Sequence, residues 1–194
     1  IRSNNKRNVI NQKKMKIKIC GIKTEKAALY ASEEKADFIG LVYVKDVRRE
    51  ISVDQGIKIV NSIKNNLSET PSVVGLFQNQ SPSYVEMIAR KSRLDFVQLC
   101  GDNDDFSNFS VPSIRQIRIK PEYSKKQIQD EVFSALNIHS LVILDSYDEE
   151  KPGGTGKVFN WDKILGFKSY ENIFIAGGLN SENIYSLLSQ LIPW

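Results

Sequence analysis

Short apolar runs alternate with longer amphipathic segments from Met15 to the end of the chain. The short runs are rich in β-branched residues, which predicts strands. They lie at residues 15–22, 36–43, 72–77, 95–100, 113–120, 140–146 and 172–178. Several of them are apolar at consecutive positions, as a strand covered on both faces requires. The pattern therefore predicts a parallel sheet with helices on its outside.

The segments between the predicted strands have the polar and apolar spacing of helices. Thr24 is placed to cap a helix over residues 24–35, and Ser52 to cap one over 53–65. Ser81 and Pro82 open the next helix in the usual order of cap and then proline. Further helices are expected within 103–109, near 124–136, over 159–165 as a short one, and over 181–191. Uninterrupted alternation of strand and helix is typical of α/β folds.

Residues 1–14 differ from the rest of the chain. They are polar and basic, and they carry neither a helical nor a strand period. We expect a disordered extension or a non-native addition there. Residues 15–194 are then expected to form one folded domain, since that length is ordinary for a single domain.

Composition and charge narrow the class of protein. The net charge of +4 is spread along the chain, which suits an anionic small molecule and is too mild to indicate nucleic-acid binding. A solvated, lysine-rich surface explains the same charge. Two cysteines in 194 residues fit a reducing cytoplasm better than a disulfide framework. No apolar run approaches the roughly 20 residues of a membrane helix, so no membrane partner is expected.

Chemically distinctive residues stand at the carboxyl ends of many predicted strands. They are Cys20, Arg49, Cys100, Asp145 and the pair Gly177 and Gly178. An open parallel sheet collects its site at one switch point, whereas a closed β/α barrel collects it from the whole rim. The spread of these residues favours the barrel.

Each candidate group also has a plainer interpretation. Cys20, followed by a glycine, could serve as a thiolate base or could be a small buried apolar residue. Asp145 ends an apolar run, where a buried carboxylate is costly unless it has a bonding partner or a functional role. It could also cap a helix or anchor a loop. Arg49 could bind a carboxylate or phosphate with its planar fork, and Arg48 is the alternative. His139 precedes a strand and is expected to be structural or exposed at the opposite end of the barrel.

Two glycine-rich strings are suited to bind an anion. GGTG at residues 153–156 precedes a short predicted helix and does not have the spacing of a P-loop. Gly177 and Gly178 lie between a strand and a helix, where barrels commonly hold phosphate. A simple glycine turn is the alternative in both places.

Six strings occur in one order along the chain: KICGIK, VGLF, VQLCG, ILDS, GGTGKVFNW and AGGLN. Together they resemble phosphoribosylanthranilate isomerase of tryptophan biosynthesis. The resemblance implies a (β/α)8 TIM barrel that converts N-(5-phosphoribosyl)anthranilate into 1-(2-carboxyphenylamino)-1-deoxyribulose 5-phosphate by an Amadori rearrangement. It also implies general acid/base catalysis without a metal or organic cofactor, on a small phosphosugar substrate.

The same resemblance assigns roles to residues of this chain. It implies Cys20 as the catalytic base and Asp145 as the catalytic acid. It implies that the substrate is bound by Arg49, Gln98, Gly154, Gly177 and Gly178.

The chain departs from the family pattern in two ways. Cys100 stands where the family usually has histidine, and the chain stops at LIPW, before the family's eighth strand, second phosphate loop and final helix. We therefore expect a barrel truncated after the seventh β/α unit, weakly active or inactive as it stands. Fusion to, or association with, a neighbouring enzyme of the pathway stays open.

Two other functions compete with the isomerase. One is a phosphate- or metabolite-binding module that kept the barrel and lost the chemistry. The other is a different phosphosugar barrel enzyme, such as a relative of indole-glycerol-phosphate synthase or a histidine-pathway isomerase. The KICGIK string argues against both of these other barrel enzymes. The joint presence of Cys20, Asp145 and Arg49 argues against the binding module.

Overall fold

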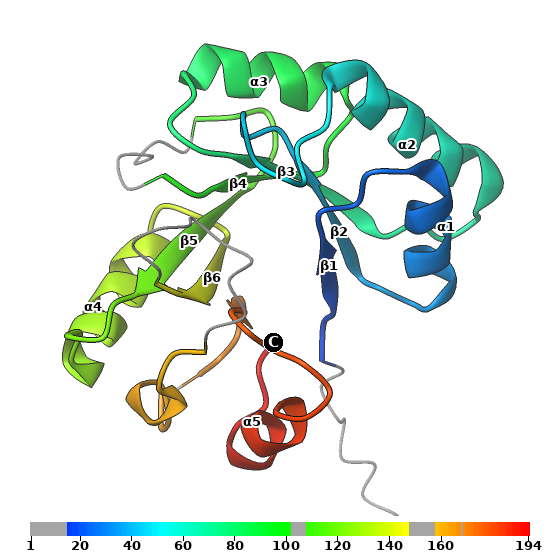
Figure 1. Ribbon diagram of the computed structural model, residues 1–194. Coiled ribbons are helices and arrows are strands. Elements are labelled where there is room, and N and C mark those ends of the chain that lie inside the picture. The colour runs from blue at the N-terminus through cyan, green and yellow to red at the C-terminus, as the bar shows by residue number, and fades with distance from the viewer. Residues whose placement is uncertain (1–14, 102–107, 148–157, 168) are drawn as a thin grey trace, which may run out of the picture.

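A single parallel sheet forms the centre of the molecule. The computed structural model describes residues 15–101, 108–147, 158–167 and 169–194. Within them, seven strands pair in sequence order, every neighbouring pair parallel (Figure 1). The strands are β1 (Lys18–Cys20), β2 (Phe38–Val42), β3 (Ser72–Phe77), β4 (Phe96–Leu99), β5 (Ser113–Ile119), β6 (Leu141–Ser146) and β7 (Ile173–Ile175). The predicted parallel α/β fold is confirmed.

Helices connect most of the strands, and the first three begin at the predicted caps. They are α1 (Glu25–Glu33), α2 (Val53–Asn66), α3 (Pro82–Lys91), α4 (Lys125–Leu136) and α5 (Ile184–Gln190). The hydroxyl groups of Thr24, Ser52, Ser81 and Ser124 each accept a hydrogen bond from the main-chain N–H three residues later. These bonds satisfy donors that a helix start leaves without intrahelical partners.

The sheet curls until its inner face packs against itself. Phe38 of β2 contacts Phe174 of β7 edge to face, with ring centroids 5.2 Å apart, although these strands are five places apart in the sheet. Phe38 also meets Phe96 of β4, at 5.6 Å. A flat open sheet would hold β2 and β7 far apart, since neighbouring strands are spaced by about 4.8 Å. The structure is therefore barrel-like, as predicted (Figure 1).

The outer face of the sheet is covered in two portions. Residues of α1, α2 and α3 pack on β2, β3 and β4 in one apolar cluster, and residues of α4 and α5 pack on β5, β6 and β7 in another. A third cluster, which includes Phe38, Val74, Ile114, Ile143 and Phe174, fills the interior enclosed by the curl. The curl is thus stabilised from inside and outside by buried apolar side chains.

Trp194 bridges the space between the first and last strands. Its main-chain N–H donates to the carbonyl of Ile173 over 3.4 Å, and its carbonyl accepts from the N–H of Lys16 over 3.1 Å. Its ring packs on Phe174 and Phe38, with centroid distances of 5.3 and 5.9 Å. In the described part of the chain, no strand pairs β1 with β7 beyond this residue. Among the described strands, β1 and β7 are therefore the two edges of the sheet, as a barrel truncated after its seventh β/α unit would have, and Trp194 connects them at the amino end of the strands.

Two predicted helices differ from the structure. The segment expected as a helix over 159–165 forms only one 3-10 turn, η1 (Trp161–Lys163). Gly166, with a φ of 72°, follows it in a conformation that ends helices, so the segment is too short to nucleate an α-helix. The helix expected over 181–191 begins only at Ile184, because the Asn180 side chain accepts hydrogen bonds from the N–H groups of Glu182 and Asn183 and holds a turn instead.

Some predicted features lie outside the described residues. They are the extension 1–14, most of the weak helix within 103–109, and the glycine string 153–156. In the part of the chain that the structure describes, the helices are all too short and too polar to cross a membrane.

Candidate active site

The carboxyl ends of the parallel strands bring two candidate catalytic groups to one interior surface. Cys20 is the last residue of β1, and Asp145 is the last but one of β6. Both residues are partly buried. The thiol of Cys100, just after β4, interacts electrostatically with both of them. Three groups from distant parts of the chain therefore meet at the rim of the barrel.

Asp145 is held on several sides. The side-chain amide of Gln116 donates to Oδ2 over 2.6 Å, and the main-chain N–H of Ser146 donates to Oδ1 over 2.8 Å. Gly177 packs so closely that a Cβ added there would lie 2.8 Å from Oδ1. Burial raises the pKa of Asp145, while these hydrogen bonds and the charges of Lys18 and Arg118 oppose the rise. A buried carboxyl with a raised pKa suits a general acid.

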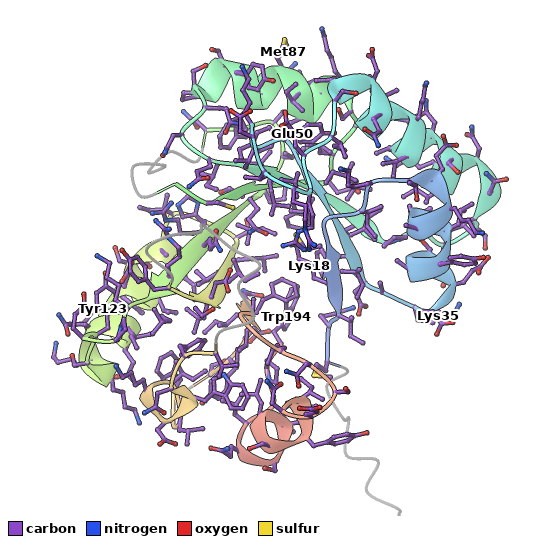
Figure 2. All side chains as sticks on the ribbon, viewed as in Figure 1. Lys18, Lys35, Glu50, Met87, Tyr123 and Trp194 are labelled. Carbon is purple, nitrogen blue, oxygen red and sulfur yellow. The ribbon has the colours of Figure 1, made fainter. Side chains whose placement is uncertain are left out.

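Cys20 points into the interior beside β2. Its residue pairs with Gly40, and a Cβ added at Gly40 would lie only 2.9 Å from the Cys20 sulfur. Lys18 precedes it by two residues and so shares the same face of β1. Figure 2 shows the Lys18 side chain inside the curl of the sheet. Cys20 and the Lys18 ammonium group therefore belong to the same inner surface of the sheet.

Arg49 reaches the end of β1 from the segment after β2. Its Nη1 donates to the main-chain carbonyl of Cys20 over 3.0 Å. Its side chain lies against Gly21, which has a φ of 87°, and leaves no space for a Cβ there. Arg48 contributes only its carbonyl, which accepts from the Lys23 ammonium over 3.1 Å. Of the two arginines left open by the sequence, Arg49 is the one that the structure brings to Cys20.

Gln98 and Cys100 lie side by side on β4 and just beyond it. Gln98 is 2% exposed, and its amide nitrogen contacts the Cys100 sulfur at 3.4 Å. Its Oε1 is buried and has no hydrogen-bond partner among the described residues. Burial raises the pKa of the Cys100 thiol to about 12. Cys100 therefore stays protonated near neutral pH, and Gln98 offers a free acceptor to a ligand.

Gly177 and Gly178 follow β7 with φ values of 85° and 62°. Within the described residues, neither main-chain N–H donates a hydrogen bond. The side chain of Asn183 donates to the carbonyl of Gly178 over 2.8 Å and fixes this turn. Successive free N–H groups suit an anion. These glycines lie between β7 and α5, and the Asn180 turn separates them from the start of α5 at Ile184. The predicted site residue Gly154 lies outside the described residues.

Gln116 and Lys18 belong to the site but were not predicted from the sequence. Gln116 is 8% exposed on β5, and strand alternation directs it inward with Ile114. A buried amide on the inner face, beside the strand that carries Asp145, was the available signal. His139, in contrast, is buried, and its Nδ1 lies 2.8 Å from Ser113 Oγ. It is a structural residue at the amino end of the strands.

The donor set of the site does not suggest a resident metal. Among the described residues, no group of three or more histidine, cysteine, aspartate or glutamate side chains is arranged to hold a metal ion. The polar groups at the rim are instead an acid, a thiol, an arginine, an amide and main-chain donors. These groups can transfer protons and bind anions.

Comparison with protein families identifies one family over nearly the whole folded region. The model described as N-(5'phosphoribosyl)anthranilate (PRA) isomerase matches residues 17–194. An N-(5'-phosphoribosyl)anthranilate isomerase of a Thermoanaerobacter species is 31% identical over 185 residues, which cover 93% of this chain and 85% of the relative. The enzyme of that name from Leptospira borgpetersenii is 34% identical over 188 residues, covering 93% and 82%.

Solved structures have the same fold. Phosphoribosyl anthranilate isomerase of Thermotoga maritima matches with a TM-score of 0.74 at 25% identity, over 93% of this chain and 85% of that one. A second phosphoribosyl anthranilate isomerase structure matches with a TM-score of 0.70 at 22% identity, over 93% and 84%. That protein is in complex with reduced 1-(o-carboxyphenylamino)-1-deoxyribulose 5-phosphate.

Proposed function

The chain belongs to the N-(5'-phosphoribosyl)anthranilate isomerase family, and from this premise we propose how its residues carry out the reaction. The reaction is the Amadori rearrangement of N-(5-phosphoribosyl)anthranilate in tryptophan biosynthesis. One observation carries the assignment of roles. A thiol, Cys20, and a buried carboxyl with a raised pKa, Asp145, face one interior surface at the rim of the barrel. An isomerisation needs one group to give a proton and another to take one.

Asp145 is the acid of the first step. It gives its proton to the ring oxygen of the ribose, and the bond from that oxygen to the carbon bearing the nitrogen breaks. The nitrogen lone pair forms a protonated Schiff base, and Asp145 becomes a carboxylate. Burial supports this role because it keeps part of the Asp145 population protonated when the substrate arrives.

Cys20 is the base of the second step. The Schiff base acidifies the proton on the adjacent sugar carbon, and the Cys20 thiolate removes it. The electron pair moves into the Schiff base and forms an enolamine, which tautomerises to the aminoketone product. The inward position of Cys20 at the end of β1 supports this role, and so does the cation Lys18 on the same face.

Arg49 and the glycine turn hold the two anionic ends of the substrate. The Arg49 guanidinium is suited to the anthranilate carboxylate, because its planar fork matches a carboxylate. The free N–H groups of Gly177 and Gly178 are suited to the phosphate. The buried Oε1 of Gln98 can accept a hydrogen bond from the sugar or the amine. Fixing both ends aligns the reacting carbons with Cys20 and Asp145.

The test is a turnover assay on the chain with two variants. The fluorescence of the anthranilate substrate is followed as it is consumed by residues 1–194, by Cys20→Ser and by Asp145→Asn. We expect weak turnover by the chain and a further loss of about 10²-fold or more in each variant, as for removal of a general acid or base. A chain that binds a product analogue but gives no turnover would instead be a binding module.

A further inference from the structure

We propose that Gln116 is a positioning residue for Asp145. Its side-chain amide fixes the orientation of the carboxyl group and stabilises the carboxylate that remains after proton transfer. The inference rests on the proposed function, in which Asp145 gives a proton to the substrate. Gln116 itself neither titrates nor needs to touch the substrate.

The contact is short, buried and directed. Gln116 Nε2 lies 2.6 Å from Asp145 Oδ2, at the short end of the range for such bonds. In the sheet, Gln116 pairs with Ile143, so its side chain reaches diagonally along the inner face to the residue two places further on β6. The side chain is 8% exposed, which shields the bond from water. Burying an amide costs free energy unless the amide has such a hydrogen-bond partner.

The other sides of the carboxyl group are also occupied. Ser146 N donates to Oδ1 over 2.8 Å, and Gly177 packs against the same oxygen. The Ser146 bond holds only Oδ1, whereas Gln116 holds Oδ2 from a different strand. The two bonds together fix the rotation of the carboxyl group relative to the barrel.

The chemical effect follows from which form of Asp145 each donor prefers. A donor on a carboxyl oxygen favours the charged form, and therefore lowers the pKa that burial raises. Asp145 then releases its proton more readily than burial alone would allow. Without the amide, Asp145 would be protonated more of the time and would be a weaker acid.

Three described titratable or charged groups also act on Asp145. Lys18 faces it from β1 and Arg118 from β5, and both lower its pKa. Cys100, beyond β4, interacts with it as well. Among the described residues, the hydrogen bonds to the Asp145 carboxyl group come from Gln116 and Ser146, not from these three groups. A substitution that removes only the amide therefore leaves the charges around the carboxyl group in place.

The test compares Gln116→Met with Gln116→Glu. Methionine keeps the length and loses the donor, so we expect kcat to fall by about 10-fold to 100-fold, as expected for a lost hydrogen bond to a charged group. We expect the alkaline limb of the kcat profile, where the protonated acid is lost, to move up by about one pH unit. Gln116→Glu adds a like charge and moves the limb further in the same direction. The carboxyl carbon of Asp145, followed by NMR without substrate, should titrate with the same displacement.

Ser113→Ala is the matched control. It removes another buried polar contact of β5, the one with His139, at the end of the strand away from the site. We expect it to lower stability and to leave both the pH profile and the Asp145 titration unchanged. An unchanged Asp145 titration in both Gln116 variants would overturn the proposal. If the chain itself shows no turnover, the proposed function fails, and the NMR titration still decides on Gln116.

Discussion

The guanidinium of Arg49 donates a hydrogen bond to the main-chain carbonyl of Cys20, over 3.0 Å. The proposed ligand of the substrate carboxylate is thus fixed to the residue proposed as the base. The two come from segments 29 positions apart in the chain. In the proposed mechanism, this contact would couple substrate binding to proton abstraction, and Gly21 leaves the space that the Arg49 side chain occupies.

Gly21→Ala should break this coupling. An alanine there would have to adopt a φ of 87° and would collide with Arg49 Cδ, so either the loop or the arginine must move. We expect displacement of Arg49 to raise KM by about 10-fold, which corresponds to about 1.4 kcal/mol of binding free energy. The left-handed backbone of the alanine should separately lower stability by about 1–3 kcal/mol. Steady-state kinetics and thermal unfolding measure the two effects.

Gly166→Ala provides the control for backbone strain. Gly166 has a similar φ of 72°, but the nearest atom to an added Cβ is Lys125 Nζ at 3.5 Å. This variant should lose stability and keep its KM. Equal KM values for the two variants would show that Gly21 affects only the backbone conformation of its loop and not the position of Arg49.

Arg49→Met should weaken binding of the substrate more than it slows the chemistry. The apolar stem packs against Gly21 in either residue, while the charged fork is lost. We expect KM to rise by at least about 10-fold, from the loss of a hydrogen-bonded charge. Arg48→Met, one position earlier and tied to Lys23 only through its main chain, should change KM by less than about twofold. The reverse order of effects would assign the carboxylate to Arg48.

The two cysteines should respond differently to serine. A hydroxyl at position 20 is too weak a base near neutral pH, so Cys20→Ser should lower kcat by about 10²-fold or more. Burial raises the pKa of Cys100 to about 12, and its thiol is therefore not an alternative base. Cys100→Ser should keep kcat within about threefold. Equal losses in both variants would contradict the assignment of the base to Cys20.

The sequence is sufficient to predict the order of strands and the starts of most helices. Apolar runs such as residues 72–77 are short and apolar at consecutive positions, as in a strand covered on both faces, and β3 spans the same residues. Ser52 and Ser81 cap their helices as predicted, because capping depends on atoms only three residues away. Local interactions decide these features, so local patterns reveal them.

Features that depend on distant contacts could not be predicted in this way. The bond from Gln116 to Asp145 joins residues 29 positions apart, and it requires the pairing of β5 with β6 to be known. The choice of Arg49 over Arg48 depends on which side chain meets the end of β1. The late start of α5 depends on competition between the Asn180 side chain and the helix for the same N–H groups. Periodicity contains no information on any of these contacts.

Trp194 should stabilise the curl of the sheet. Its ring fills the interior between Phe38 and Phe174, and its main chain bonds to Ile173 and Lys16. Trp194→Ala removes the ring and leaves a cavity, with an expected loss of about 2–3 kcal/mol in the free energy of unfolding for this partly buried site. Denaturant unfolding measures it. Ile192→Ala, at a side chain that is 68% exposed, should cost less than about 0.5 kcal/mol. A similar loss in both variants would mean that the interior does not depend on Trp194.

Asp145→Asn should separate stability from activity. Burial raises the pKa of Asp145 in the folded state above its unfolded value. Its contribution to stability is therefore full below the unfolded pKa and is lost as the pH rises through the folded pKa. Wherever Asp145 is ionised in the folded state, its partly buried carboxylate costs stability. Asparagine removes that charge, and the Gln116 amide can rotate so that its oxygen accepts a hydrogen bond from the asparagine.

We therefore expect Asp145→Asn to unfold at a higher temperature than the parent chain at pH 7, by about 2–4 °C for each kcal/mol gained. The difference should shrink toward pH 4, where Asp145 takes up its proton in both states. Turnover should fall by about 10²-fold or more in the same variant. Scanning calorimetry at several pH values measures the first effect. A stability difference that is independent of pH would indicate that the gain comes from packing rather than from the lost charge.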